Sequence, residues 1–302
     1  MHETQIVARL RRLAESGHRN RSIVKGIGDD CAILRPRVNE DLVFTTDFVL
    51  EGRHFTLETH KAADVGHKAL ARSLSDLAAM GSEPVFCLVS LAVPASVRPS
   101  WIDGFYKGLL ALGDKYGIAL AGGDLARFDK VVADVICCGR VPRGKALVRG
   151  GAKPGDSIYV TGELGASAHG FATKRGRAWR RHLRPEPRIA AGIALRKLGV
   201  SAAMDLSDGL SLDLRRLCVE SNAGAEIEAA ALPVARGASE AEALHGGEDY
   251  ELLFTASPKT RVPSSIDGLP VTHIGAIVKT NRPGTVRING QSLPANGFDH
   301  FA

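Results

Sequence analysis

The chain has 302 residues, which is enough for two domains that each bury a hydrophobic core. Hydrophobic residues make up 44% and charged residues 24%, an ordinary globular composition, and the formal net charge is +6. No apolar run reaches the roughly 18 residues of a membrane span, and the first residues show no signal-peptide pattern. We therefore expect a cytoplasmic protein that makes no membrane contact.

Much of the positive charge lies in residues 174–188. Trp179 is the one aromatic side chain in this segment that could stack on a base, so we do not expect nucleic-acid binding. We interpret the segment as a solvated basic loop. A second interpretation is that part of it attracts a phosphorylated substrate.

The cysteines are spaced without a CxxC pair, mostly inside apolar segments. They are Cys31, Cys87, Cys137, Cys138 and Cys218. This pattern predicts buried, reduced thiols, and neither a zinc site nor a disulfide framework.

The first half begins with a predicted helix over residues 4–14 and a glycine turn that leads to Asp30. Residues 42–44 predict a short buried strand whose end presents Thr45, Thr46 and Asp47. Hydroxyl and carboxylate oxygens are ligands that a hard cation such as Mg²⁺ takes. The alternative is that these residues only form a turn and a polar strand cap.

Residues 62–80 have helical periodicity, and Asp76 lies beside the apolar stripe of this helix. Arg72, one turn earlier, is a possible partner, although an exposed pair of this kind contributes only a few tenths of a kcal/mol. A core strand over 85–93 and a helix over 101–116 follow. The next strand, 118–124, is expected to end in two glycines and Asp124, where the backbone can approach a ligand.

The segment 139–155 is rich in Gly, Pro, Arg and Lys and is the expected linker, which gives domains 1–140 and 141–302. It contains the pattern GxxxxGK, but Ala146 stands where a P-loop needs a Ser or Thr hydroxyl. Pro142 also lacks an N–H that would contact phosphate. We therefore reject a Walker-type nucleotide site.

The second half repeats the theme of polar residues at a strand end. A strand is predicted at 157–161, a helix at 189–198, and another strand near 202–205 that ends in Asp205, followed by Ser207 and Asp208. Ser207 could simply cap the next helix, but that role leaves Asp205 without an explanation. Glu248 lies at the start of a further predicted strand, and two more strands are predicted after it. The sequence therefore predicts an α/β chain in two halves.

Carboxylates that converge on one cleft would repel one another. A pair of like charges about 4 Å apart costs about 4 kcal/mol at an effective dielectric near 20. Several bound cations, bridged by phosphate oxygens, would offset that cost. The pattern therefore suggests a site where two phosphorylated substrates meet on several Mg²⁺ ions.

The motifs that carry this pattern also resemble those of one family. They are GIGDDCA at 26–32, TTD at 45–47, EGRHF at 51–55, LSDLAAMG at 74–81, GGD at 122–124, DLSDG at 205–209 and HGGEDYEL at 245–252. Their order along the chain, from about residue 3 to 301, is similar to that of the thiamine-monophosphate kinases.

The resemblance implies the aminoimidazole ribonucleotide synthetase-like fold, α/β (α+β) with two domains, and an N-terminal domain that forms a homodimer across its sheet. It also implies transfer of the γ-phosphoryl group of ATP to thiamine phosphate. The implied Mg²⁺ ligands are Asp30, Thr45, Thr46, Asp47, Asp76, Asp124, Asp205 and Asp208. The implied ATP contacts are Tyr106, Gly123, Asp124, Arg149 and Ser207. The implied contacts to thiamine phosphate are His54, Glu248 and Phe298.

The expected chemistry needs no general base, because the second pKa of a phosphate monoester is near 6 and its oxygen is already nucleophilic at pH 7. We expect direct transfer without a phosphoenzyme. The alternatives are another ATP-dependent enzyme of the same fold, such as an aminoimidazole ribonucleotide synthetase, and a non-catalytic metal- or nucleotide-binding scaffold. A selenophosphate synthetase should have a Cys beside a Lys near the N-terminus, and a hydrogenase-maturation relative should end in Cys; this sequence has neither.

Overall fold

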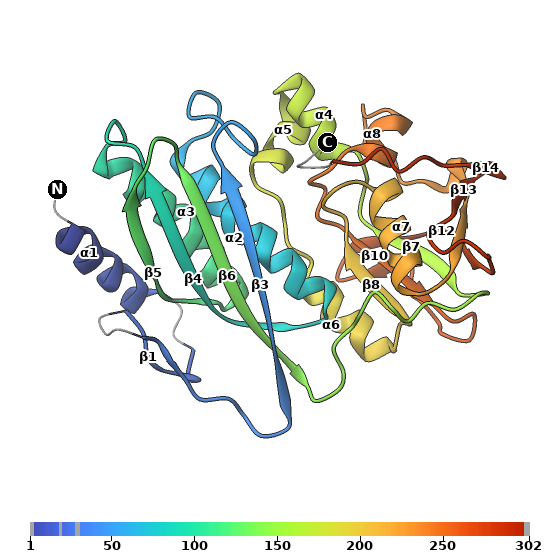
Figure 1. The fold of residues 1–302 in the computed structure, drawn as a ribbon, viewed down its shortest axis with the longest axis horizontal. Coiled ribbons are helices and arrows are strands. Elements are labelled where there is room, and N and C mark those ends of the chain that lie inside the picture. Colours follow the sequence, from blue (N-terminus) through green and yellow to red (C-terminus); the bar gives the residue numbers. More distant parts are fainter. Residues whose placement is uncertain (1–2, 18–19, 28–30, 299–302) are drawn as a thin grey trace. The chain divides into compact units, whose positions relative to one another are not determined.

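A computed structural model describes residues 3–17, 20–27 and 31–298 (Figure 1). The chain forms two compact units, the first made of residues 1–77 and 82–144 and the second of residues 78–81 and 145–302. The first unit thus extends to Gly144, whereas the sequence placed the domain boundary after residue 140.

The first unit is built on a four-stranded sheet with the order β3-β6-β4-β5. Its strands are β3 (Glu40–Leu50), β4 (Glu83–Val93), β5 (Ala119–Arg127) and β6 (Val132–Pro142). Strands β4 and β5 pair in parallel, and the other neighbours pair antiparallel. A small separate sheet joins β1 (Ile23–Lys25) to β2 (Ile33–Leu34).

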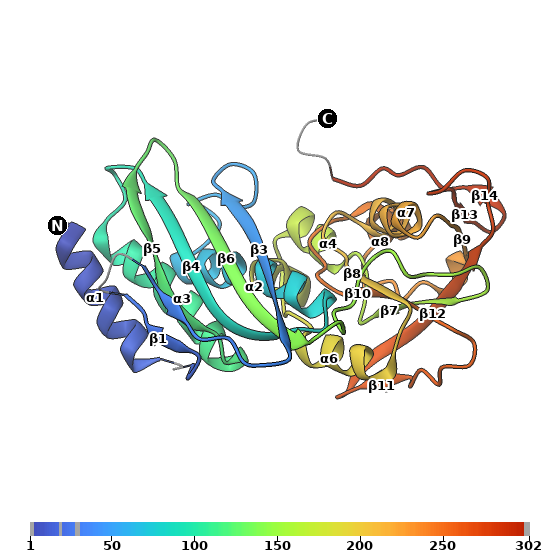
Figure 2. The same ribbon diagram turned by 60° about the horizontal axis from the view of Figure 1, so that its bottom comes forward.

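Two helices, α2 (Ala62–Ala79) and α3 (Pro99–Tyr116), cover one face of the sheet, and α1 (Glu3–Ser16) lies beside β5 (Figures 1 and 2). The apolar stripe predicted for α2 is confirmed, because Leu70, Leu74 and Leu77 are at most 1% exposed. Glycines let the two covering helices pack closely. A Cβ on Gly66 would lie 1.9 Å from the carbonyl oxygen of Phe105, and one on Gly108 would lie 1.9 Å from that of Ala63.

Strand β3 differs from its prediction, because it is 11 residues long and carries Thr45, Thr46 and Asp47 in its middle and not at its end. It is also an edge strand with one uncovered face, on which Phe44 is 62% and Phe48 57% exposed. The prediction of a short buried strand is therefore wrong. Pairing with β6 along its whole length extends the strand beyond its apolar start.

Strands β5 and β6 also run further than expected. Strand β5 continues past Asp124, because its parallel pairing with β4 persists to the pair Val93 and Arg127. Strand β6 continues to Pro142 opposite Glu40, so the first residues of the expected linker belong to the sheet. Continued strand pairing thus outweighs the glycine-rich local sequence.

The second unit contains an eight-stranded sheet with the order β14-β13-β9-β12-β7-β10-β8, to which β11 adds by pairing with β12. Its pairs are antiparallel except β13 with β9. The strands are β7 (Ser157–Thr161), β8 (Ala202–Asp205), β9 (Gly224–Ile227), β10 (Leu252–Ala256), β11 (Ser265–Ile266), β12 (Leu269–Val278), β13 (Val286–Ile288) and β14 (Gln291–Ser292). The helices are α4 (Ala166–Thr173), α5 (Gly176–Leu183), α6 (Ile189–Leu198), α7 (Leu210–Glu220) and α8 (Glu240–His245), with a 3₁₀ turn η1 (Ala229–Ala231).

Two further expectations need correction. The basic segment 174–188 is not a solvated loop, because it contains helix α5 and because Arg181 and Arg188 reach the buried carboxylate of Glu251. Of the five free cysteines, four are buried as predicted, but Cys31 is exposed. Within the described part of the chain, no helix has the length and apolar character needed to cross a membrane.

Candidate active site

In the first unit, Thr45, Asp47 and Asp76 lie on the helix-covered side of the sheet. The Thr45 hydroxyl donates a hydrogen bond to Oδ2 of Asp76. Arg72, which the sequence suggested as a partner of Asp76, has Nη2 3.5 Å from Oδ1 of Asp47. The middle of β3 and one face of α2 thus bring together three of the predicted metal ligands.

Thr46 points to the other side of the sheet. Successive side chains of a strand alternate between its faces, and the Thr46 hydroxyl donates a 2.5 Å hydrogen bond to Oδ1 of Asp134 on β6. Sequence reasoning did not single out Asp134. A contact from Thr46 to a metal held by Thr45, Asp47 and Asp76 would therefore have to come from its main-chain oxygen, because a change of rotamer does not move a side chain to the other face of a sheet.

The pKa of Asp47 bears on whether this group of residues could hold a metal ion. Burial and the neighbouring carboxylate of Asp76 raise the pKa of Asp47 to about 7, although Arg72 lowers it. A divalent cation would offset this repulsion. Across the residues described, no three His, Cys, Asp or Glu side chains gather as one metal-binding group. Two carboxylates and a hydroxyl nevertheless fit Mg²⁺, which usually takes one or two carboxylates and fills its other positions with water and phosphate oxygens.

A small pocket of about 90 Å³ in the first unit brings together three residues predicted to contact ATP, namely Tyr106, Gly123 and Asp124. Its remaining lining is apolar and comes mainly from α1 and β5. Gly123 has φ 156°, and a Cβ there would lie 2.0 Å from the carbonyl oxygen of Val89, so this position needs glycine. Asp124 is exposed, and its Oδ1 accepts the N–H of Leu125 at 2.9 Å.

His54 follows β3 and is 7% exposed. Its Nδ1 accepts the N–H of Leu50 at 3.0 Å, which places the ring proton of a neutral His54 on Nε2. Asp30 lies outside the described residues.

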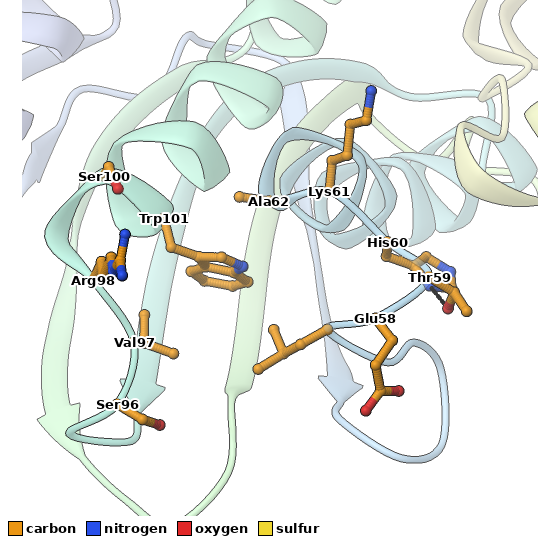
Figure 3. A pocket seen from close by; sticks show the side chains of 11 residues that line it. Glu58, Thr59, His60, Lys61, Ala62, Ser96, Val97, Arg98, Ser100 and Trp101 are labelled. Atoms are coloured by element: carbon orange, nitrogen blue, oxygen red, sulfur yellow. Dashed lines mark hydrogen bonds between the residues drawn. The ribbon is translucent and has the colours of Figure 1, made fainter.

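A larger hollow of about 590 Å³ lies between residues 57–62 and 96–101 of the first unit (Figure 3). The indole of Trp101 projects into it, with Val97 and Ala62 nearby. Among the described residues, none that the sequence predicted for the site lines this hollow.

In the second unit, Asp205, Ser207 and Asp208 occupy the turn between β8 and α7. Ser207 is not the cap of α7, because Gly209 occupies the N-cap position. The main-chain N–H groups of Ser207, Asp208 and Gly209 all donate to Oδ2 of Asp213, at 3.0–3.1 Å. Asp213 is fully buried, and burial raises its pKa to about 6. Sequence reasoning missed this residue, although an acid in the first turn of a helix is a known capping signal.

Arg216 is a second residue that the sequence did not single out. Its Nη1 lies 2.5 Å from Asp208 Oδ2 and 2.9 Å from Asp213 Oδ1. Asp208, a predicted Mg²⁺ ligand, is thus ion-paired in this structure, and a cation would have to share its carboxylate with Arg216.

Glu248 and Phe298, both predicted to contact thiamine phosphate, lie against the same turn. The N–H of Glu248 donates to the carbonyl oxygen of Ser207 at 2.8 Å, and the N–H of Phe298 donates to that of Asp208 at 2.9 Å. Phe298 is 40% exposed. The second unit therefore gathers five predicted site residues around the start of α7.

Arg149 lies apart from this group within the second unit. Its carbonyl oxygen accepts the hydroxyl of Ser221, which follows the C-terminal end of α7. Helix α7 has 11 residues, and the rise of about 1.5 Å per residue makes it about 16 Å long. The proposed ATP contact of Arg149 therefore stays a prediction.

Comparisons with known proteins show the family and the fold of this chain. The models of the AIR synthase related protein family match the chain with their N-terminal domain at residues 28–141 and with their C-terminal domain at residues 153–287. The thiamine-monophosphate kinase of Escherichia coli (strain K12) is 41% identical over 92% of both chains. This chain belongs to the thiamine-monophosphate kinase family.

Solved structures of this family share the whole fold. A thiamine-monophosphate kinase from Stenotrophomonas maltophilia K279a is 36% identical, has a TM-score of 0.84, and matches over 97% of this chain and 98% of the other. AaThiL, solved in complex with AMPPCP and TMP, is 30% identical with a TM-score of 0.79 over 99% and 97% of the two chains. The hydrogenase maturation protein HypE, at 16% identity and a TM-score of 0.77, is similar in fold alone.

Proposed function

We propose that this member of the thiamine-monophosphate kinase family transfers the γ-phosphoryl group of ATP to thiamine phosphate, giving thiamine diphosphate and ADP. The observation that carries the proposal is 41% identity to a thiamine-monophosphate kinase along nearly the whole chain. AaThiL was solved with AMPPCP and TMP, which supports ATP and thiamine phosphate as the two substrates.

Magnesium ions are the second part of the proposal. In the first unit, Thr45, Asp47 and Asp76 form an oxygen-only donor set with crowded carboxylates. The other proposed ligands are Asp30, Thr46, Asp124, Asp205 and Asp208. When bound, Mg²⁺ neutralises charge on the phosphate oxygens of both substrates.

The residues of the chain would align the two substrates and would not transfer a proton. Tyr106, Gly123 and Asp124, which line the small pocket, are proposed to contact part of ATP. Ser207 and Arg149 are further proposed ATP contacts. His54, Glu248 and Phe298 would hold thiamine phosphate. The acceptor phosphate has a second pKa near 6 and is nucleophilic at neutral pH, so in-line transfer requires alignment of two anions and no general base.

We also propose a homodimer formed through the uncovered face of the first unit's sheet. Phe44, Thr46 and Phe48 project from this face of β3, and their register partners on β6 include Ile136 and Asp134. Exposed aromatic side chains on one sheet face are a feature of protein interfaces.

We place the reaction in the cytoplasm, where ATP is available.

The direct experiment is an ADP-release assay of the purified full chain with thiamine phosphate, with and without Mg²⁺. Free thiamine is the matched control, because it lacks the acceptor phosphate. We expect turnover with thiamine phosphate and Mg²⁺ together. Equal ADP release with thiamine and with thiamine phosphate would contradict the proposal, and trapping of a ³²P-labelled protein from γ-labelled ATP would contradict direct transfer.

A further inference from the structure

The segment 246–251, between α8 and β10, has an unusual backbone. Glu248 has φ 65° and Tyr250 has φ 51°, in the left-handed region that residues with a Cβ rarely adopt. Such a conformation costs free energy and persists only where the surroundings hold it in place. The contacts around this segment should therefore include strong anchors.

The first anchor is Asp249, which is 4% exposed. Its Oδ2 accepts the N–H of Gly165 at 2.6 Å, and its Oδ1 accepts that of Ser167 at 3.0 Å, so it binds the start of α4. Burial raises the pKa of Asp249 to about 6, while these two hydrogen bonds and Arg181 lower it.

The second anchor is Glu251, whose side chain is fully buried. Arg188 holds it with two bonds, from Nε to Oε2 at 2.8 Å and from Nη2 to Oε1 at 2.5 Å. Arg181 donates to the same carboxylate, and the hydroxyl of Thr161 donates to Oε2 at 2.6 Å. A Cβ on Gly162 would lie 2.1 Å from Oε1, so the backbone leaves room for this carboxylate.

Helix α5, which carries Arg181, also reaches Glu248. His182 on α5 is 5% exposed, and its Nδ1 lies 3.5 Å from Oε2 of Glu248 and 2.9 Å from the hydroxyl of Ser167. The His182 ring stacks on Trp179, with ring centroids 5.2 Å apart. The basic segment therefore contacts this stretch at two positions, Glu248 and Glu251.

We propose that Arg181 and Arg188, acting through Glu251, are positioning residues for the binding of thiamine phosphate. They fix the backbone of residues 246–251 so that Glu248 keeps the orientation in which it contacts that substrate. This inference rests on the proposed function, since it takes Glu248 as a contact to thiamine phosphate. It also gives the basic segment 174–188 a role in substrate binding that does not need direct contact with phosphate.

The test is Arg188→Lys, which keeps the positive charge but loses the planar fork that matches a carboxylate. We expect the KM for thiamine phosphate to rise about tenfold, the usual scale for loss of a supporting contact, while the KM for ATP changes less than about twofold. The matched control is Arg180→Lys on the exposed side of α5, for which we expect both KM values to stay at wild type. Arg181→Lys provides a second variant should Arg188→Lys fail to fold.

Hydrogen exchange at residues 246–251 reads the segment independently of turnover. Faster exchange in Arg188→Lys than in Arg180→Lys, together with the selective KM change, would support the inference. An unchanged KM for thiamine phosphate, or an equal rise in both KM values with a lower melting temperature, would show a purely structural role and overturn it. If the wild type does not turn over thiamine phosphate, the proposed function is overturned. Faster exchange in Arg188→Lys would then still show that Arg188 anchors residues 246–251.

Discussion

The carboxylate of Asp76 lies close enough to that of Asp47 to disfavour the ionisation of Asp47, although the two residues come from a helix and a strand and are 29 positions apart. Arg72 relieves part of this repulsion at Asp47. Such a pair of like charges reduces the stability of the folded state, and the cation that we propose would offset this cost.

The first prediction is that Asp47→Asn nearly abolishes turnover and leaves the fold intact. The substitution removes a proposed Mg²⁺ ligand, but it also removes a repulsive charge, so the melting temperature should stay at or above that of the wild type. Steady-state kinetics at saturating Mg²⁺ and a thermal melt measure the two effects. A wild-type rate at saturating Mg²⁺ would show that Asp47 is not a ligand.

The second prediction is that Mg²⁺ binding releases protons around neutral pH. Without the metal, the pKa of Asp47 is raised to about 7, mainly by burial and also by Asp76. A ligand carboxylate must be ionised, so Mg²⁺ binding at pH 6 displaces a proton that is already lost at pH 8. The apparent affinity should therefore increase as the pH rises from 6 to 8, by up to about tenfold.

Calorimetric titration of Mg²⁺ without nucleotide, in two buffers of different ionisation enthalpy, counts the released protons. We expect more protons released at pH 6 than at pH 8 for the wild type. The same number at both values would rule out Asp47 as the group that ionises on binding.

The third prediction concerns Asp213, which accepts three main-chain N–H groups from the turn that carries Ser207 and Asp208. Asp213→Ala leaves these donors without their acceptor and should lower the free energy of unfolding by about 2–4 kcal/mol. It should also raise the KM for ATP, because Ser207 is a proposed ATP contact. Denaturant unfolding and kinetics test both effects, with Glu220→Ala on the exposed end of α7 as the control. Equal stability of the two variants would contradict the capping role.

The fourth prediction tests the dimer. Phe48 is 57% exposed on the uncovered face of the sheet, so Phe48→Asp should place a charge in the proposed interface and shift the protein towards the monomer. Val38, which is 88% exposed in the turn before β3, provides the control Val38→Asp. Analytical ultracentrifugation measures the association state. If the wild type is a monomer, or if both variants associate as the wild type does, the proposed interface is wrong.

The sequence alone was sufficient for the family, the two-part α/β organisation and the apolar stripe of α2. These depend on local spacing: motifs keep their order along the chain, and a helix repeats its buried face every three to four residues. Leu70, Leu74 and Leu77 could be assigned to the core without knowing what they pack against.

Only the tertiary structure decided which side of β3 each polar residue takes, because β3 extends through its polar residues by pairing with β6, 88 positions away at Thr46 and Asp134. It also decided what the basic segment contacts, since Arg188 reaches Glu251 across 63 positions. The net charge of a segment does not indicate whether its side chains meet solvent or a buried carboxylate. That outcome depends on which distant residues the fold brings within hydrogen-bond distance.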